Sequence, residues 1–414
     1  MKKGIVIGAS RDAIHTIKKA REKGIYVVAL DGNPNAEGFK FANESIVVDI
    51  SDLDKTSNEV ARIKPDFTIP IPIGRYLSTM GYINDKFQLE GACYEATRLS
   101  TDKYVFHKKL NEENLRNVQL YLIDENTKLD EIKMEYPAIL KPRFGSGSRD
   151  VYFLKSKDDL KEIFEQIKKM KEDFVLEQAV DGDEYGVDGA VINGKLQITL
   201  LRKKVITPLP VRQAVASFAE TNMKLYDAVR IFLQKVIETL NYNNCLVNAD
   251  LIINKEQIFV IEAAPRPSGH NLHNVFVPLA TDIDIAEEYI KFLLGAKYNF
   301  IPTRIEKIQI RFFDFNDVYV KYIPTLVQLK NKLGDSLVEW NCSLKENEYL
   351  GKVVNGHSIM GRGFFVVKGC TEGDLIEKSD WVLSQFGVMQ RGEKIKNEFA
   401  RKSEKKHGIN IFQK

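Results

Sequence analysis

Apolar and polar residues alternate in a pattern that changes twice along the chain and predicts three units. In residues 1–98, apolar runs at 4–8, 26–30, 45–50 and 66–73 are separated by segments with helical spacing, including a helix expected near 52–63. Strands that alternate with helices are typical of a parallel sheet with crossover helices. The first unit is therefore expected to be a small α/β domain, without the complete GxGxxG of a dinucleotide site.

From about residue 99 the apolar runs are joined by short turns and predict an α+β unit of antiparallel strands over 99–298. The expected strands are 138–142, 150–154, 174–178, 185–192, 196–201, 245–253 and 258–264. A lysine-rich helix is expected at 156–172, inside a lid at about 135–185. A third α+β unit is expected over 299–414, with strands at 308–315 and 363–369, a helix at 371–386 and a solvated polar tail.

Composition and charge exclude several classes of protein. The apolar fraction of 44% and the charged fraction of 28% are those of a globular protein with substantial cores. A net charge of +3 over 414 residues argues against a broad nucleic-acid surface. No run reaches the roughly 18 apolar residues of a membrane span, and the four cysteines form no CxxC pair. We therefore expect a cytoplasmic protein without nucleic-acid or membrane partners.

The first candidate for chemistry is a lysine that ends an apolar strand just before a flexible loop. Lys141 is followed by Pro142 and by the loop RFGSGSRD at 143–150. Free backbone N–H groups around Gly147, the hydroxyls of Ser146 and Ser148, and the lysine charge would together cradle phosphates. The spacing is not that of a P-loop, and a hairpin turn explains the loop equally well.

The second candidate is the stretch FVLEQAVDGDEYGVDG at 174–189. Backbone amides from Glu177 through Gln178 to Val180 are predicted to pair with an adenine edge, and Glu184 to accept from ribose hydroxyls. The alternative is a polar hairpin, which is the better explanation if the stretch stands alone.

The third candidate is a pair of acids in two neighbouring apolar strands. Asp250 and Glu262 are flanked by apolar residues, where an unpaired carboxylate is costly. On antiparallel partners the two can converge beside a phosphate cradle and hold Mg²⁺; two surface acids are the alternative. Arg266, held between two prolines, is predicted to clamp a carboxylate or phosphoryl group.

Taken in order, these segments resemble the ATP-grasp superfamily of carboxylate–amine ligases. TDKYVFHKKL at 101–110 is similar to the segment that opens the family's grasp domain, and AILKPRFGSGSRDV, VLEQAVDGDEYGVDG and NADLIINKEQIFVIEAAPRPSGH are similar to its later motifs. The resemblance implies that Lys103 and Lys141 contact ATP phosphates. It also implies that Glu177 and Val180 flank the adenine, that Glu184 holds ribose, that Asp250 and Glu262 bind the metal, and that Arg266 steadies the phosphoryl group.

The resemblance further implies a fold and an activity. Residues 357–388 are similar to the C-terminal segment of the biotin-carboxylase-like branch. This implies a pre-ATP-grasp α/β domain, a central ATP-grasp domain and a C-terminal subdomain, within an enzyme that joins a carboxylate to an amine through an acyl phosphate. ATP with Mg²⁺ or Mn²⁺ would be required. The oligomeric state stays open, with a homodimer as the commonest case among soluble proteins. The alternative is a carboxylase or formyl-phosphate enzyme like the purine-pathway carboxyaminoimidazole-ribonucleotide synthases; a non-catalytic nucleotide-binding protein is a weaker rival.

The sequence departs from the family at Ala264, where most members carry an asparagine that binds the metal. Water could fill the gap, Asn248 or Asn271 could replace the amide, or one ion could bind alone. His270 is interpreted either as a loop residue or as a substrate contact and proton acceptor, beside predicted substrate contacts at Ser268 and Gly269.

Charged residues outside these motifs receive separate interpretations. Arg75, at the end of a first-domain strand, is predicted to bind the acceptor, because ligands bind at such strand ends. Arg202 and Lys204 are interpreted either as substrate contacts or as solvated charges at a strand edge, with the second interpretation preferred, and His273 is interpreted as structural.

Overall fold

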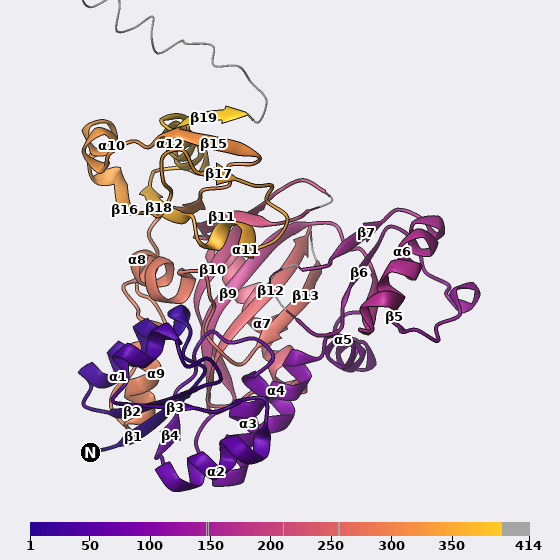
Figure 1. The fold of residues 1–414 in the computed structure, drawn as a ribbon, viewed down its shortest axis with the longest axis vertical. Helices are drawn as coiled ribbons and strands as arrows, with labels where there is room; N and C mark the ends of the chain where they lie inside the picture. Colours follow the sequence, from indigo (N-terminus) through magenta and orange to yellow (C-terminus); the bar gives the residue numbers. More distant parts are fainter. Residues whose placement is uncertain (146, 148, 210, 256, 391–414) are drawn as a thin grey trace, which may run out of the picture.

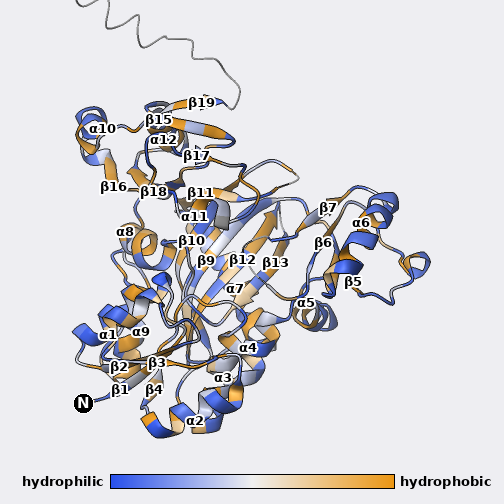
Figure 2. Ribbon diagram, viewed as in Figure 1, coloured by the Kyte–Doolittle hydropathy of each residue, from blue (hydrophilic) through white to orange (hydrophobic). Residues whose placement is uncertain are grey.

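The computed structural model describes residues 1–145, 147, 149–209, 211–255 and 257–390. Figure 1 shows a large central sheet with the N-terminal unit packed at one end and the C-terminal unit at the other. A small sheet with its own helix projects from the side. Figure 2 shows apolar residues gathered on the central strands, while polar and apolar residues alternate on α1 (Ile14–Glu22) and α6 (Lys157–Met170). This alternation is expected for helices with one buried face.

The N-terminal unit is the α/β domain expected from the alternation of strands and helices. Its parallel sheet has the order β3–β2–β1–β4. The strands are β1 (Lys3–Ile7), β2 (Tyr26–Asp31), β3 (Glu44–Val47) and β4 (Phe67–Thr68). The helical elements after α1 are η2 (Glu37–Phe41), α2 (Leu53–Ile63), α3 (Leu77–Phe87) and α4 (Tyr94–Thr101), and η1 (Arg11–Ala13) precedes α1. The run at 66–73 forms only two strand residues, because Pro70 and Pro72 lack the N–H that the sheet ladder requires.

The central sheet is antiparallel, with the order β13–β12–β9–β10–β11–β14–β18–β16. Its strands are β9 (Asp183–Ile192), β10 (Lys195–Ile206), β11 (Ala214–Ala219), β12 (Cys245–Asn254), β13 (Gln257–Ala264), β14 (Ile308–Phe312), β16 (Leu337–Cys342) and β18 (Gly363–Lys368). The sheet passes through the boundary expected at 298/299, because β11 pairs with β14. The division into three domains stays a prediction.

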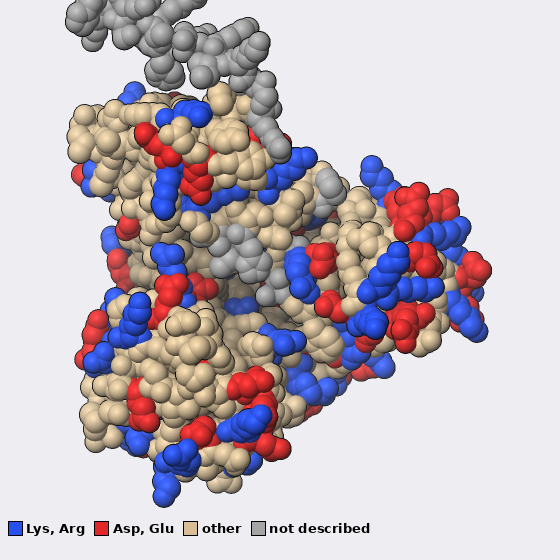
Figure 3. All heavy atoms as spheres, in the orientation of Figure 1, with Lys and Arg blue, Asp and Glu red and all other residues tan. Residues whose placement is uncertain are grey.

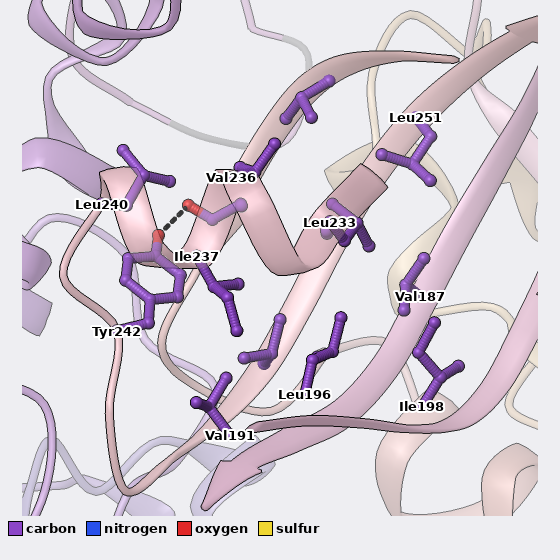
Figure 4. Close-up of a cluster of buried hydrophobic side chains, with 14 of the residues drawn as sticks. Val187, Val191, Leu196, Ile198, Leu233, Val236, Ile237, Leu240, Tyr242 and Leu251 are labelled. Atoms are coloured by element: carbon purple, nitrogen blue, oxygen red, sulfur yellow. Dashed lines mark hydrogen bonds between the residues drawn. The ribbon is translucent and has the colours of Figure 1, made fainter. Parts of the chain in front are cut away.

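One face of this sheet is covered by α7 (Met223–Thr239). Its buried residues recur at helical spacing and pack on side chains of β9, β10 and β12 (Figure 4). Tyr242, just beyond the helix, donates a hydrogen bond to the Ala263 carbonyl at 2.8 Å. The core of the central unit therefore lies between α7 and the strands, and the opposite face of the sheet is left to build a site.

The small sheet has the order β5–β8–β6–β7 and packs against α6. Its strands are β5 (Leu120–Ile123), β6 (Ala138–Pro142), β7 (Tyr152–Leu154) and β8 (Phe174–Gln178). The helical elements beside it are α5 (Lys103–Glu112) and η3 (Leu129–Glu131). The sheet therefore begins before the lid expected at about 135–185. In the loop between β6 and β7, the Gly147 carbonyl accepts a hydrogen bond from the Gly356 N–H at 3.2 Å, so this loop reaches the C-terminal unit.

The C-terminal unit adds a three-stranded sheet of order β17–β15–β19 to the end of the central one. Its further elements are β15 (Val318–Tyr322), α10 (Leu326–Leu333), η5 (Gly334–Ser336), β17 (Tyr349–Leu350), α11 (His357–Met360), α12 (Glu372–Ser384) and β19 (Gly387–Gln390). Before it lie η4 (Leu272–Phe276), α8 (Val277–Thr281) and α9 (Ile285–Leu293). Within the described part of the chain, every helix is too short or too polar to cross a bilayer.

Candidate functional site

A cavity of about 490 Å³ lies where the N-terminal unit, the small sheet and the exposed face of the central sheet meet. Figure 3 shows a hollow at this junction, with Lys and Arg side chains around it. The predicted site residues that line the cavity are Lys103, Lys141, Gly147, Glu177, Gln178, Val180, Glu184, Asp250, Glu262, Arg266, Ser268, Gly269 and His270. Ser146 and Ser148 lie outside the described residues. The roles predicted for the lining residues stay predictions.

Arg75 lies away from this cavity. Its guanidinium is exposed and stacks on the Tyr76 ring at 5.1 Å, whereas Ile73 and Gly74 of the same loop line the cavity. Its position gives no support to the predicted role in acceptor binding.

One end of the cavity is built by a buried ionic cluster around Glu177. Its Oε1 accepts from the Lys141 ammonium at 2.6 Å, and its Oε2 accepts from Arg116 Nη2 at 2.8 Å. Arg116 Nη1 donates to His107 Nδ1 at 2.8 Å, and His107 Nε2 lies 3.2 Å from Glu177 Oε2 and 3.3 Å from the Lys141 ammonium. Arg116 also donates to the Val260 carbonyl and thereby joins the small sheet to β13. Neither His107 nor Arg116 was predicted from the sequence.

The charges of this cluster follow from its burial and its partners. Burial raises the pKa of the Glu177 carboxyl, but Arg116 and Lys141 outweigh burial and leave that pKa below its usual value. Burial, followed by the nearby Arg116 and Lys141 charges, lowers the pKa of His107 well below its usual value, so this histidine is neutral. The cluster therefore holds one carboxylate between two cations.

The amides predicted to meet the adenine are partly used by the fold. The Gln178 N–H donates to Gln119 O at 3.1 Å, and the Ala179 N–H donates to Pro137 O at 2.9 Å. Two amides of this stretch are therefore used by the fold, and the pairing of the stretch with adenine stays a prediction. Among the described residues, the Val180 N–H has no such partner.

Lys103 connects the start of α5 with the loop of 143–150. Asp102 caps this helix, since its side chain accepts from the Val105 N–H. The Lys103 ammonium donates to the Gly145 carbonyl at 2.7 Å. Burial lowers the pKa of Lys103 to about 8, with the Lys141 charge adding to the effect and Glu262 opposing it. A polyanion bound at this end would favour the charged form of Lys103 and raise its pKa again.

The two predicted metal ligands lie opposite each other on β12 and β13. Asp250 pairs in register with Glu262, and both line the cavity. Asp250 Oδ2 also contacts the Lys204 ammonium at 2.5 Å. No group of three His, Cys, Asp or Glu side chains that could hold a metal occurs among the described residues. Two carboxylates fit an ion such as Mg²⁺ that takes its other ligands from phosphate oxygens and water.

The position of Ala264 favours the account in which Asn248 replaces the amide that most family members carry at residue 264. Ala264 pairs in register with Asn248, which is largely buried and lines the cavity. Asn271 stands directly before η4 and is not part of the lining. An amide is therefore present on the neighbouring strand, opposite the position where most family members carry theirs.

The segment after β13 forms one wall of the cavity. Arg266 Nη1 donates to the Pro267 carbonyl at 2.8 Å. Burial lowers the pKa of Arg266, while Glu262 and Asp250 oppose the effect. His270 has a left-handed backbone with φ of 57° and lines the cavity. Asp12 of the N-terminal unit also lines the cavity. Asp12 was not predicted, because a lone acid after a glycine turn carries no signal of its own.

The interpretation of Arg202 and Lys204 as solvated charges is wrong. Both line the cavity, and Arg202 is only 1% exposed. Arg202 Nε donates to Asp188 Oδ2 at 2.6 Å, and the fully buried Asp188 also accepts from the Ser268 hydroxyl. Residues 202 and 204 share one face of β10, and the other units of the molecule cover that face. Glu184, the predicted ribose ligand, is paired with Arg212 at 2.5 Å.

His273, interpreted as structural, is buried beside these residues. It is 1% exposed, and within the described part of the chain neither ring nitrogen has a hydrogen-bond partner. Burial, and then the neighbouring His15, lower its pKa to about 4. His273 is not part of the cavity lining.

Comparisons with known proteins identify the domain that carries this cavity. A family model described as the ATP-grasp domain matches residues 134–274. The carbamoyl-phosphate synthase of Methanobrevibacter smithii is 22% identical over 267 residues, which cover 60% of this chain and 70% of that protein.

Solved structures extend the likeness to most of the chain. The L-amino acid ligase of Bacillus licheniformis superposes with a TM-score of 0.75 at 14% identity, covering 95% of this chain and 99% of that one. The N5-carboxyaminoimidazole ribonucleotide synthetase of Thermotoga maritima superposes with a TM-score of 0.69 at 19% identity, covering 94% and 100%. The chain thus carries an ATP-grasp domain, and the ATP-grasp fold expected from the sequence is confirmed over most of its length.

Proposed function

We propose that this protein is an ATP-dependent ligase that joins a carboxylate to an amine through an acyl phosphate. The observation that carries the proposal is the register pairing of Asp250 with Glu262 in the same cavity as Lys103, Lys141 and Arg266. Two acids beside three cations match the charges of a nucleotide triphosphate and its metal ion. A purely structural role would leave this set of buried charges unexplained.

The proposed reaction needs no covalent nucleophile from the protein. An oxygen of the substrate carboxylate attacks the γ-phosphorus of ATP, the bond to the β,γ-bridging oxygen breaks, and ADP leaves. The amine nitrogen then attacks the acyl carbon, phosphate leaves, and the amine loses a proton. The protein supplies position and charge: Lys103 and Lys141 neutralise phosphate oxygens, and Arg266 holds the phosphoryl group as it moves. Mg²⁺ or Mn²⁺ held by Asp250 and Glu262 would add positive charge at the same oxygens.

The ionic cluster around Glu177 has a role in this scheme. Lys141 is held by Glu177 at 2.6 Å, and its ammonium has further N–H donors that can face a phosphate. Arg116, which contacts the other oxygen of Glu177, keeps that carboxylate in place when the lysine turns to the nucleotide. His270 has a place at the cavity wall from which it can accept the proton that the amine loses.

The acyl phosphate must be kept from water, and the loop of 143–150 lies where it can exclude water from the cavity. The hydrogen bond between Gly147 O and Gly356 N joins this loop to the C-terminal unit across the cavity. We infer that the loop is a lid that closes over the nucleotide. A cytoplasmic location and a homodimer remain predictions.

A second candidate is a carboxylase of the carboxyaminoimidazole-ribonucleotide-synthase type. Ala264 favours it, because those enzymes also carry alanine before Pro-Arg, and one of them superposes on 94% of this chain. Both solved structures share the fold of this chain, so the substrate screen below is what distinguishes the two candidates.

The test is a screen of ADP release over pairs of L-amino acids, followed by transfer of ¹⁸O from labelled carboxylate to phosphate. The ligase predicts ADP release that needs both substrates, and one labelled oxygen in the phosphate. Absence of label would rule out an acyl phosphate. Bicarbonate-dependent ADP release with aminoimidazole ribonucleotide would instead establish the second candidate.

Lys141→Met tests whether the cavity carries this activity. We expect ATP turnover to fall by at least about a hundredfold, since the lysine is both buried and central. Lys161→Met is the matched control, because Lys161 lies on the exposed side of α6, where it pairs with Asp158. Equal turnover in the two variants would contradict the site.

A further inference from the structure

The cavity has a second end that the nucleotide does not require. The phosphate and adenine candidates lie on α5, the small sheet and the strands β12 and β13. In the sheet order β13–β12–β9–β10–β11–β14, the cavity continues past β9 to Arg202 on β10, Ser217 on β11 and Phe312 on β14. Of the central strands that line the cavity, β10, β11 and β14 are the ones farthest in the sheet order from β13, and a second substrate has room beside them.

Arg202 is the charged group that dominates this end. Its side chain is among the largest fully buried ones in the described chain, yet it lines the cavity. Its Nε is fixed by Asp188, which the Ser268 hydroxyl holds in turn. Among the described residues, neither Nη1 nor Nη2 has a hydrogen-bond partner. A guanidinium has five N–H donors, and because Arg202 lines the cavity, its four Nη N–H groups are open to a ligand there. The arrangement calls for an anionic ligand.

The glycine beside it fixes the direction in which the guanidinium lies. A Cβ added to Gly186 would come within 2.5 Å of Arg202 Nη1 and 2.6 Å of Nη2. The guanidinium therefore rests directly on the backbone of β9, the neighbouring strand. In register, Arg202 pairs with Gly186, Gly186 with Asp250, and Asp250 with Glu262. The guanidinium thus lies over β9 and points toward the two acids. It is about one strand spacing, roughly 5 Å, from β12, the strand that carries Asp250.

We propose that Arg202 binds the carboxylate that the enzyme activates, through its two Nη atoms, with Asp188 and Ser268 as the residues that position it. The assignment rests on the proposed function. A planar fork with two parallel donors matches a carboxylate in both geometry and charge. A carboxylate held there lies beside Asp250 and Glu262, where the γ-phosphoryl group must arrive. Lys204, which neutralises Asp250 at 2.5 Å, reduces the repulsion between that acid and the incoming carboxylate.

The experiment compares acids with their amides on the protein saturated with Mg²⁺ and ADP. Each of the twenty L-amino acids and its carboxamide is titrated while the unfolding temperature is followed. The variants are Arg202→Lys, which keeps the charge and loses the fork, and Arg202→Met with Asp188→Leu, which removes the buried pair together. Lys203→Met is the control, since Lys203 lies on the same strand but pairs with Glu372 outside the cavity.

We expect at least one amino acid to bind the wild type while its amide does not. Both Arg202 variants should weaken that binding by about 10- to 100-fold, with ADP affinity unchanged and with Lys203→Met behaving as the wild type. Three results would overturn the assignment: an amide that binds as well as its acid, folded variants that bind the acid normally, or no amino acid that binds the ADP-saturated wild type. Carboxylate binding that depends on Arg202 without phosphate release from ATP would refute the ligase alone.

Discussion

Binding of ATP is expected to take up a proton at alkaline pH, because Lys103 has a lowered pKa in the free protein. Burial lowers this pKa from 10.5 to about 8. Four phosphate charges beside the ammonium would return the pKa to at least its ordinary value. At pH 9 the free lysine is mostly neutral and the bound lysine is charged, so uptake should approach about 0.9 proton per ATP. At pH 7 the lysine is charged in both states and uptake should be close to zero.

The same shift gives the free-energy cost of keeping the buried Lys103 charged in the folded protein. The difference between 10.5 and about 8 corresponds to about 3 kcal/mol at pH values below 8. Between pH 8 and 10.5 the unfolded chain binds more protons than the folded one, so the free energy of unfolding should rise with pH in this window. Above pH 8 the ATP affinity should fall by about tenfold for each pH unit.

Titration calorimetry at pH 9, in two buffers with different ionisation enthalpies, measures the uptake directly. Lys103→Met is the reference, and it should show no uptake and no dependence of affinity on pH in this range. An uptake below about 0.2 proton in the wild type, or equal uptake in the variant, would refute the assignment of Lys103 to the phosphates.

Three further substitutions test other parts of the site. Arg116→Met removes one of the two cations that hold the buried Glu177, and urea denaturation should record a loss of about 3 kcal/mol; a loss under about 1 kcal/mol would contradict the cluster's role. Gly186→Ala places a methyl group against the Arg202 guanidinium, so carboxylate-dependent phosphate release should drop more than about tenfold while ADP still binds. Ala264→Asn should change the Mg²⁺ requirement of nucleotide binding by less than about twofold if the amide already present opposite it suffices; a tenfold fall would show that a ligand was missing.

The parts of the fold that the sequence predicted well are those with local signals. The runs at 138–142 and 174–178 coincide with β6 and β8, because each is apolar and ends at a charge or a turn. The hairpin of β12 and β13 follows the same rule. By contrast, β15, β17 and β19 carry mixed polarity on partly exposed strands, and their apolar pattern is too weak to predict them.

The site shows the same division between local and distant information. Lys141, Asp250 and Glu262 stand out because a charge at or within an apolar strand is unusual. Arg116 sits in an ordinary polar loop, and its importance arises from its meeting Glu177, 61 positions away. Arg202 belongs to a run of three basic residues, and which face of its strand is enclosed depends on units folded from both ends of the chain. Contacts of this kind have no signature in a local pattern.

The pairing of β11 with β14 has a consequence for how this protein can be dissected. Eight strands form one hydrogen-bonded surface, so the nucleotide side and the C-terminal unit are not modules that can be exchanged or expressed apart. A truncation before Ile308 would remove β14, one of the two neighbours of β11, and leave an open edge that can pair with another molecule. A relative with a different C-terminal unit would likewise need a strand that pairs with β11 at Ala216, Ser217 and Phe218. Changes in substrate specificity are therefore expected in the loops and side chains that line the cavity, while the eight-stranded sheet beneath them is kept.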